Sequence, residues 1–98
     1  MQVVESRANS RIAVVIPSYK VTRHVLDVIS RIGSEVERIY VVDDKCPDGS
    51  GQFVQANCPD PRVVIIHNAE NQGVGGATVA GYSAAIADRM DIIVKVDG

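Results

Sequence analysis

The chain has 98 residues, which is enough for one small domain. Hydrophobic residues make up 46% of it and charged residues 22%, a balance typical of a globular protein and not of a disordered one. The net charge is -2 and the ten Lys and Arg residues are scattered, which argues against a nucleic-acid partner. The apolar runs are too short to span a bilayer and the start is no signal peptide. We therefore expect a cytoplasmic chain, reaching a membrane only through segments outside it.

The first secondary-structure signal begins at Ile12. Residues 1–11 are polar without an apolar period, so we expect a flexible leader there and a single α/β domain over residues 12–98. The continuous apolar run at residues 12–16 predicts a strand covered on both faces. From Thr22, the predicted N-cap, apolar residues recur at helical spacing through residue 32.

A second strand is predicted over residues 38–42, and it runs directly into Asp43 and Asp44. A Pro-Asp-Gly turn follows, in which Asp48 is expected to act as a turn and capping residue. A short helix then extends to about Asn57.

The second half of the chain repeats this alternation. Residues 63–67 predict a third strand, and residues 68–76 predict a glycine-rich irregular loop. A helix with a small-residue face is marked by four alanines: Ala77, Ala80, Ala84 and Ala87. Residues 92–96 predict a fourth strand that ends in Asp97.

Strands that alternate with helices predict an open parallel sheet of the Rossmann-like α/β class, here with about four strands and three helices. Because ligands bind outside the carboxyl ends of such strands, the residues that follow each strand are candidates for a binding site. The chain stops directly after the fourth strand has delivered an acid, so we expect it to be the front part of a longer protein.

The chemistry expected at this edge is phosphate and metal binding. The loop at residues 71–77 leads into a helix, and its exposed amides suit a phosphate group. It does not fit the dinucleotide fingerprint, because the third glycine would fall at Thr78 and the loop follows the third strand instead of the first. Since no Walker sequence is present, phosphate would be held partly by a metal, and Asp97 is a carboxylate suited to Mg²⁺ or Mn²⁺.

With these residues placed, the chain resembles the amino-terminal, nucleotide-binding part of the family 2 glycosyltransferases of the GT-A fold. Residues 15–20 are similar to that family's Val-Ile-Pro-x-Tyr-Asn turn, and residues 42–50 to its Val-Asp-Asp-x-Ser-x-Asp-Gly-Ser segment. Asn71-x-Gly73 resembles its Asn-x-Gly loop, and residues 96–98 resemble the first half of its Asp-x-Asp motif. The four motifs occur in family order across nearly the whole chain.

This resemblance implies a role for each matching residue. Pro17 and Tyr19 would line the nucleotide pocket, Asp44 would accept a hydrogen bond from the base, and Asp43 would lie beside it. Asn71 and Gly73 would lie along the ribose and diphosphate, and Asp97 would be the first acid of the metal-binding pair. The implied reaction is inverting transfer of a sugar from a nucleoside diphosphate to an acceptor, such as a polyprenyl phosphate or a growing cell-envelope polysaccharide.

The chain also departs from the family pattern. Lys20 and Val21 replace the usual Asn-Glu, and the second acid of Asp-x-Asp would fall at position 99, beyond the chain. The resemblance places the acceptor half and the catalytic base downstream, so we expect the 98 residues to be inactive by themselves. A receiver-type signalling domain is the alternative, although its acids belong after the first and third strands. A nicotinamide-binding domain is a further alternative, disfavoured by the glycine spacing.

Overall fold

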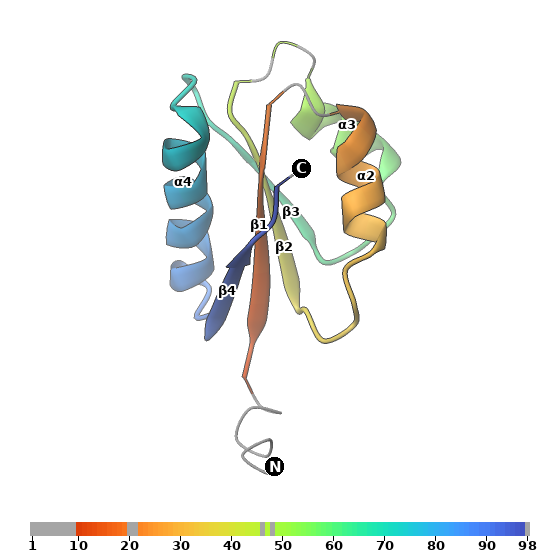
Figure 1. Cartoon of the computed structure of the whole chain (residues 1–98), viewed down its shortest axis with the longest axis vertical. Helices are drawn as coiled ribbons and strands as arrows, with labels where there is room; N and C mark the ends of the chain where they lie inside the picture. Colours follow the sequence, from red (N-terminus) through yellow and green to blue (C-terminus); the bar gives the residue numbers. More distant parts are fainter. Residues whose placement is uncertain (1–9, 20–21, 46, 48, 98) are drawn as a thin grey trace.

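A computed structural model describes residues 10–19, 22–45, 47 and 49–97 of the chain. In this part of the chain, four parallel strands form one sheet in the order β3-β2-β1-β4. The strands are β1 (Ile12–Ser18), β2 (Arg38–Asp43), β3 (Val63–His67) and β4 (Ile92–Lys95). The predicted α/β class and parallel sheet are therefore confirmed, and the four expected strands are present (Figure 1).

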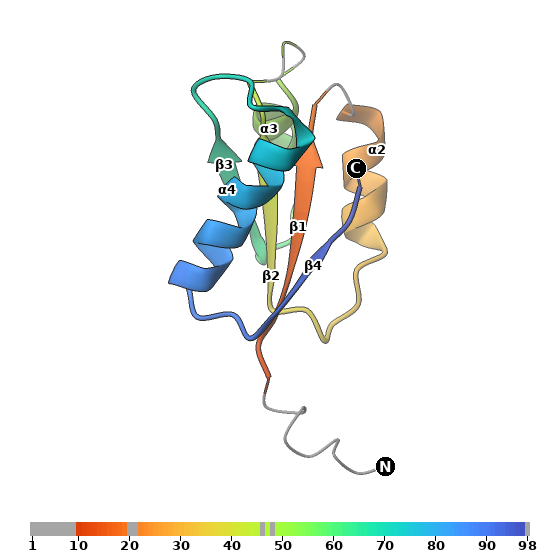
Figure 2. The ribbon, with the colours of Figure 1, turned by 60° about the vertical axis from the view of Figure 1, so that its left-hand side comes forward.

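Three helices connect these strands: α2 (Thr22–Ser30), α3 (Ser50–Asn57) and α4 (Gly73–Ala87). Helices α2 and α3 cover one face of the sheet and α4 covers the other, as Figures 1 and 2 show. This division follows from the strand order. The chain moves from β1 through β2 to β3 in one direction across the sheet and then crosses back past β1 to β4. Because the crossovers are right-handed, those that run in opposite directions across the sheet place their helices on opposite faces.

The apolar side chains alternate between these two faces. In β1, Val14 and Ile16 pack toward α2 and α3, whereas Ala13 and Val15 pack toward α4. All four are at most 4% exposed, as expected for a strand covered on both sides. On the α4 side the helix contributes only small buried residues, Ala77, Gly81 and Ala85. The predicted small-residue face is thus present, but it does not include Ala87, which is exposed.

The start of α4 differs from the sequence prediction. Residues 68–76 were expected to form an irregular loop, yet the helix begins at Gly73 and takes in Gly75 and Gly76. The reason is a tertiary contact: the carboxylate of Asp44, at the end of β2, accepts hydrogen bonds from the amides of Gln72 and Gly73. Capping from another element starts the helix where local propensity disfavours it.

Helix α2 also differs slightly at its ends. Thr22 is the first helical residue, one position later than an N-cap. At the other end, the amides of Arg31 and Ile32 bond to the carbonyls of Val28 and Ile29, a tightened final turn. The turn and capping role predicted for Asp48 lies outside the described residues, as do residues 1–9 of the predicted leader and four positions of the family motifs: Lys20, Val21, Cys46 and Gly98.

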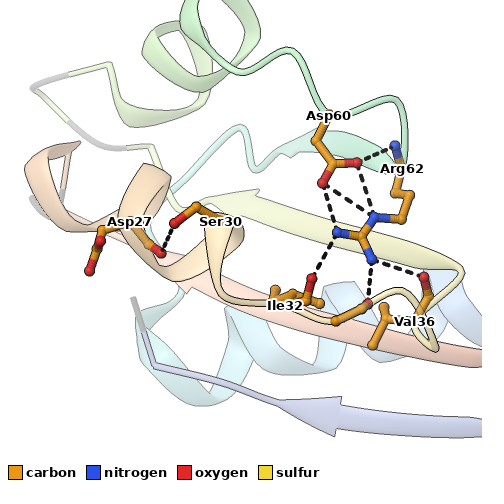
Figure 3. Close-up of polar contacts among 7 residues, drawn as sticks. Asp27, Ser30, Ile32, Val36, Asp60 and Arg62 are labelled. Carbon is orange, nitrogen blue, oxygen red and sulfur yellow. Dashed lines mark hydrogen bonds and ion pairs between the residues drawn. The ribbon is translucent and has the colours of Figure 1, made fainter.

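Arg62 ties the end of α2 to the connection between α3 and β3 (Figure 3). Its guanidinium donates to both carboxylate oxygens of Asp60 and to the carbonyls of Ile32, Gly33 and Val36. The side-chain and backbone hydrogen bonds from Arg62 lower the pKa of the Asp60 carboxyl. This guanidinium therefore gives a hydrogen-bond partner to three carbonyls of the connection between α2 and β2.

A second polar cluster lies at the amino ends of β1 and β2, next to the end of α4. The hydroxyl of Tyr40 donates to a carboxylate oxygen of Asp88 at 2.5 Å, and Arg38 donates to the same oxygen. Arg11 donates to the backbone carbonyl of Asp88 and to Glu37. Burial, and then the hydrogen bond to Asp88, raise the pKa of Tyr40 to about 12.

Candidate functional site

A cavity of about 430 Å³ opens at the carboxyl edge of the sheet, between the ends of β1 and β4. This is the point where the strand order reverses, because β2 and β3 lie on one side of β1 and β4 on the other. Open α/β sheets bind ligands at such a switch point. Among the described residues, nine line the cavity: Pro17, Ser18, Tyr19, Asp44, Asn71, Gly73, Val74, Ala77 and Asp97.

Six of the seven residues predicted for the site lie in this lining: Pro17, Tyr19, Asp44, Asn71, Gly73 and Asp97. They come from four parts of the chain that are far apart in sequence. The parallel sheet brings them together because it places every strand's carboxyl end at one edge.

Asp44 is the most extensively bonded residue of the lining. Its side chain accepts hydrogen bonds from the Asn68 amide group at 2.9 Å and from the backbone amides of Gln72 and Gly73 at 2.8 Å each. The residue is only 3% exposed. A carboxylate offers about four acceptor positions, so these three bonds leave about one for a further donor.

Asn71 and Gly73 shape the wall formed by the start of α4. The Asn71 side chain donates to the backbone carbonyl of Asp44 at 3.1 Å, and its oxygen accepts from the Gly73 amide at 3.1 Å. Gly73 has a φ of 77°, a conformation that glycine adopts without steric cost. These contacts hold the loop against β2, so the residues at the start of α4 also form part of the cavity wall.

Asp43, the seventh predicted residue, faces the other side of the sheet and does not line this cavity. Its carboxylate accepts the amide of Gly51 in α3 at 2.9 Å and lies 3.7 Å from the Nδ1 atom of His67. A Cβ atom at Gly51 would come within 2.8 Å of the same carboxylate, so glycine permits this approach. Adjacent side chains of a strand point to opposite faces of the sheet. This alternation is a sequence signal that the side chains of Asp43 and Asp44 lie on different faces.

Asp97 lies at the rim of the cavity, and its side chain is 84% exposed. Its carboxylate forms an ion pair with the ammonium of Lys95 at 3.3 Å. Such an oxygen fits one position in the coordination shell of Mg²⁺ or Mn²⁺. Within the described ranges there is no group of three or more His, Cys, Asp and Glu side chains that could hold a metal ion, so Asp97 could offer one ligand but does not form a metal site by itself.

The sequence prediction did not assign three lining residues to the site, namely Ser18, Val74 and Ala77. Ser18 lies between the predicted Pro17 and Tyr19, so its position was already within the motif. Val74 was missed because residues 68–76 were expected to form a loop, and Ala77 was expected only on the small-residue face of the helix. Once the helix begins at Gly73, positions 73, 74 and 77 share one helical face.

Comparison with known proteins identifies the family of this chain. The sequence profile of the family described as Glycosyl transferase family 2 matches residues 13–98, nearly the whole chain. The chain belongs to glycosyl transferase family 2. The resemblance inferred from its four motifs is thereby confirmed.

Relatives of this family 2 chain include two mannosyltransferases and a monophosphomannose synthase. It is 30% identical over 90 residues to an undecaprenyl-phosphate mannosyltransferase of Micrococcus luteus, covering 89% of this chain and 37% of the relative. It is 28% identical over 95 residues to a polyprenol monophosphomannose synthase of Mycolicibacterium smegmatis, covering 93% and 36%. A dolichol-phosphate mannosyltransferase of Pyrococcus furiosus is 27% identical over 82 residues, covering 80% and 23%.

The family 2 chain thus spans less than two fifths of the length of each of these relatives. Among its described residues, no helix is both long and apolar enough to cross a membrane.

Proposed function

We propose that this family 2 chain binds the nucleoside diphosphate sugar donor of an inverting glycosyl transfer. The observation that carries this proposal is the cavity at the switch point, because six residues matching family motifs line it together. Its volume of about 430 Å³ falls within the range usual for small-molecule sites. The chain would supply the donor half of the reaction, with the acceptor half and catalytic base contributed by sequence outside it.

The base of the donor would bind beside Asp44. The carboxylate is held rigidly by Asn68, Gln72 and Gly73, which supports a positioning role, and its remaining acceptor position suits an N–H donor on a base. Tyr19 is 42% exposed and lies in the same lining, where an aromatic ring can pack against a flat base. Asn71 and Gly73 would lie along the ribose and diphosphate.

The charges of the lining favour metal-dependent binding of the donor. Asp44 and Asp97 both carry carboxylates, and the described residues of the lining include no Lys or Arg, so these two charges would repel a diphosphate in the absence of a cation. We propose Mg²⁺ or Mn²⁺, with Asp97 as one ligand and diphosphate oxygens among the others. A bound divalent cation stabilises the negative charge that develops on the leaving nucleoside diphosphate.

The relatives suggest the sugar and the acceptor. All three are named as enzymes of mannose transfer or phosphomannose synthesis, and their names contain undecaprenyl phosphate, polyprenol or dolichol phosphate. We therefore propose mannose as the sugar and a polyprenyl phosphate as the acceptor. This reaction would place the whole protein at the cytoplasmic face of a membrane, where the lipid phosphate is accessible, and would serve cell-envelope polysaccharide synthesis.

Isothermal titration of the purified chain with UDP, GDP and TDP sugars tests the donor proposal. We expect one nucleotide class to bind in the presence of Mg²⁺ or Mn²⁺ and to bind at least tenfold more weakly after chelation with EDTA. The variant Asp97→Asn should lose most of this metal dependence. No heat of binding from any of the donors, with metal present and the chain folded, would refute the proposal.

A further inference from the structure

The strand geometry places Lys95 beside the proposed donor site. Ile93 packs into the core on the α4 side of the sheet, and side chains two and four residues further along a strand point to the same side. The pairing continues past the end of β4, because the amide of Val96 bonds to the carbonyl of Val15 at 2.9 Å. Lys95 and Asp97 therefore both project toward the side on which the first turn of α4 forms the cavity wall.

Lys95 supplies a positive charge next to a lining whose described residues include no Lys or Arg. Its ammonium lies 3.3 Å from a carboxylate oxygen of Asp97, which belongs to the lining. The Lys95 side chain is 35% exposed and that of Asp97 84%, so this ion pair is accessible to water. Exposed ion pairs contribute little free energy, and a competing ligand can exchange with them at small cost.

A diphosphate and a divalent cation would rearrange this pair. The cation competes with the ammonium for Asp97, since both bind the same carboxylate oxygens. The diphosphate, in turn, attracts an ammonium that carries three N–H donors on a flexible stem. The two exchanges support each other, because the ammonium displaced from Asp97 is released next to the bound anion.

We propose that Lys95 is a positioning residue that neutralises Asp97 in the free protein and transfers its ammonium to the donor diphosphate when a divalent cation binds Asp97. This proposal rests on the proposed function, since it requires a diphosphate donor in the cavity. It predicts two effects of opposite sign for loss of the Lys95 charge. The free protein should bind the metal more tightly, and the metal-loaded protein should bind the nucleotide more weakly.

The test compares Lys95→Gln and Lys95→Arg with wild type. Arg31→Gln is the matched control, because it also removes one positive charge, from an exposed ion pair with Asp27 on α2, which covers the opposite face of the sheet. Free Mn²⁺ is measured by electron paramagnetic resonance during titration of the nucleotide-free chain. Binding of GDP, UDP and TDP is measured by calorimetry at saturating Mn²⁺, and circular dichroism confirms that each variant is folded.

For Lys95→Gln we expect about two- to fivefold tighter Mn²⁺ binding, the range for losing an exposed ion pair. We expect at least threefold weaker nucleotide binding. Lys95→Arg should keep both wild-type values within twofold, and Arg31→Gln should change neither.

A parallel loss of both affinities in Lys95→Gln would indicate a structural role and overturn the inference, as would wild-type values for both. If wild type binds no nucleotide at saturating Mn²⁺, the proposed function itself fails. That outcome is distinct from one in which wild type binds nucleotide and the Lys95 variants do not differ from it.

Discussion

At the scale of single residues, Asp44 serves two purposes with one carboxylate. It holds the loop at residues 68–73 against β2 and caps α4, and it also lines the cavity. These roles are compatible because a carboxylate accepts from several directions at once. Its neighbour Asp43 performs the equivalent structural task for α3, on the other face of the sheet.

The variant Asp44→Asn should destabilise the fold. An amide retains one acceptor oxygen and replaces the other with an NH₂ group, which would then face the backbone N–H of Gly73 or of Gln72. We expect a loss of about 1–3 kcal/mol in the free energy of unfolding, measured by urea denaturation. Asp27→Asn, on the exposed surface of α2, serves as the control and should cost less than about 0.5 kcal/mol. Equal stability of the two variants would contradict the capping role.

Tyr40 predicts a pH dependence of stability. Its pKa is raised from 10.0 to about 12, so its neutral form is favoured in the folded state. The resulting stabilisation is fully present below pH 10, where the tyrosine of the unfolded chain is protonated too, and is lost as the pH rises toward 12. In urea denaturation between pH 9 and 12, wild type should therefore lose stability more steeply than Tyr40→Phe. Parallel pH profiles of the two proteins would show that the Tyr40 hydroxyl is not responsible.

At the scale of elements, close packing of α4 on the sheet depends on the absence of side chains. A Cβ atom at Gly81 would collide with Val15 of β1 and come within 3.2 Å of Val42 of β2. The helix contains no charged residue, so its position is set by shape and apolar contact and not by ion pairs. Because the same helix forms part of the cavity wall, its distance from the sheet also sets the width of the site.

Two alanine substitutions in α4 distinguish the effect of packing on stability from the effect of helix propensity. We expect Gly81→Ala to destabilise the protein by about 1–3 kcal/mol, because the methyl group forces the helix away from the sheet. Gly75→Ala is the matched control: no atom lies within 4 Å of its added Cβ, so the gain in helix propensity should make it neutral or stabilising by up to about 1 kcal/mol. Thermal denaturation of both variants measures the difference, and a stabilised Gly81→Ala variant would argue against close packing there.

Arg62 connects two loops through geometry that only a guanidinium provides. Its planar group bonds to both oxygens of Asp60 and to three carbonyls around the end of α2. Lysine keeps the charge but cannot form these bonds together. We expect Arg62→Lys to lose about 2 kcal/mol of stability in urea denaturation, whereas Arg31→Lys on the surface should be nearly neutral. If Arg62→Lys retained wild-type stability, charge alone would account for the contact.

At the scale of the whole molecule, the strand order and the place of the glycine-rich segment together separate the alternatives considered for this chain. A receiver-type domain places its third strand beside the first, whereas here β3 lies outside β2 and β4 pairs with β1. The nicotinamide-binding fold shares the order seen here, but its glycine-rich turn follows the first strand. In this chain β1 is followed by Tyr19, and the glycines follow β3.

Donor binding should stabilise the whole domain through linkage. A ligand at 100 times its dissociation constant that binds only the folded state adds about 2.7 kcal/mol. For a domain of this size that corresponds to a rise in melting temperature of roughly 10–20 °C. Differential scanning fluorimetry with the donor and Mg²⁺ should show this rise, and mannose with Mg²⁺ should not. An unchanged melting temperature at saturating donor would argue against binding by the folded chain.

The sequence by itself determined the alternation of strands and helices and the edge at which polar residues gather. It did so because period-two and period-3.6 apolar patterns, and the rule for parallel connections, depend on local chemistry. The alternation of side chains along a strand also indicates that Asp43 and Asp44 point to opposite faces, a signal that was not used when both were placed beside the nucleotide.

Only the tertiary structure decided where α4 begins and which groups share the cavity. A contact between residues distant in sequence, from Asp44 to Gln72 and Gly73, outweighs the poor helix propensity of the glycines. Pairing of β4 with β1 brings Asp97 into the same lining as Pro17 and Tyr19. Such contacts depend on the path of the chain through space, which no local pattern encodes.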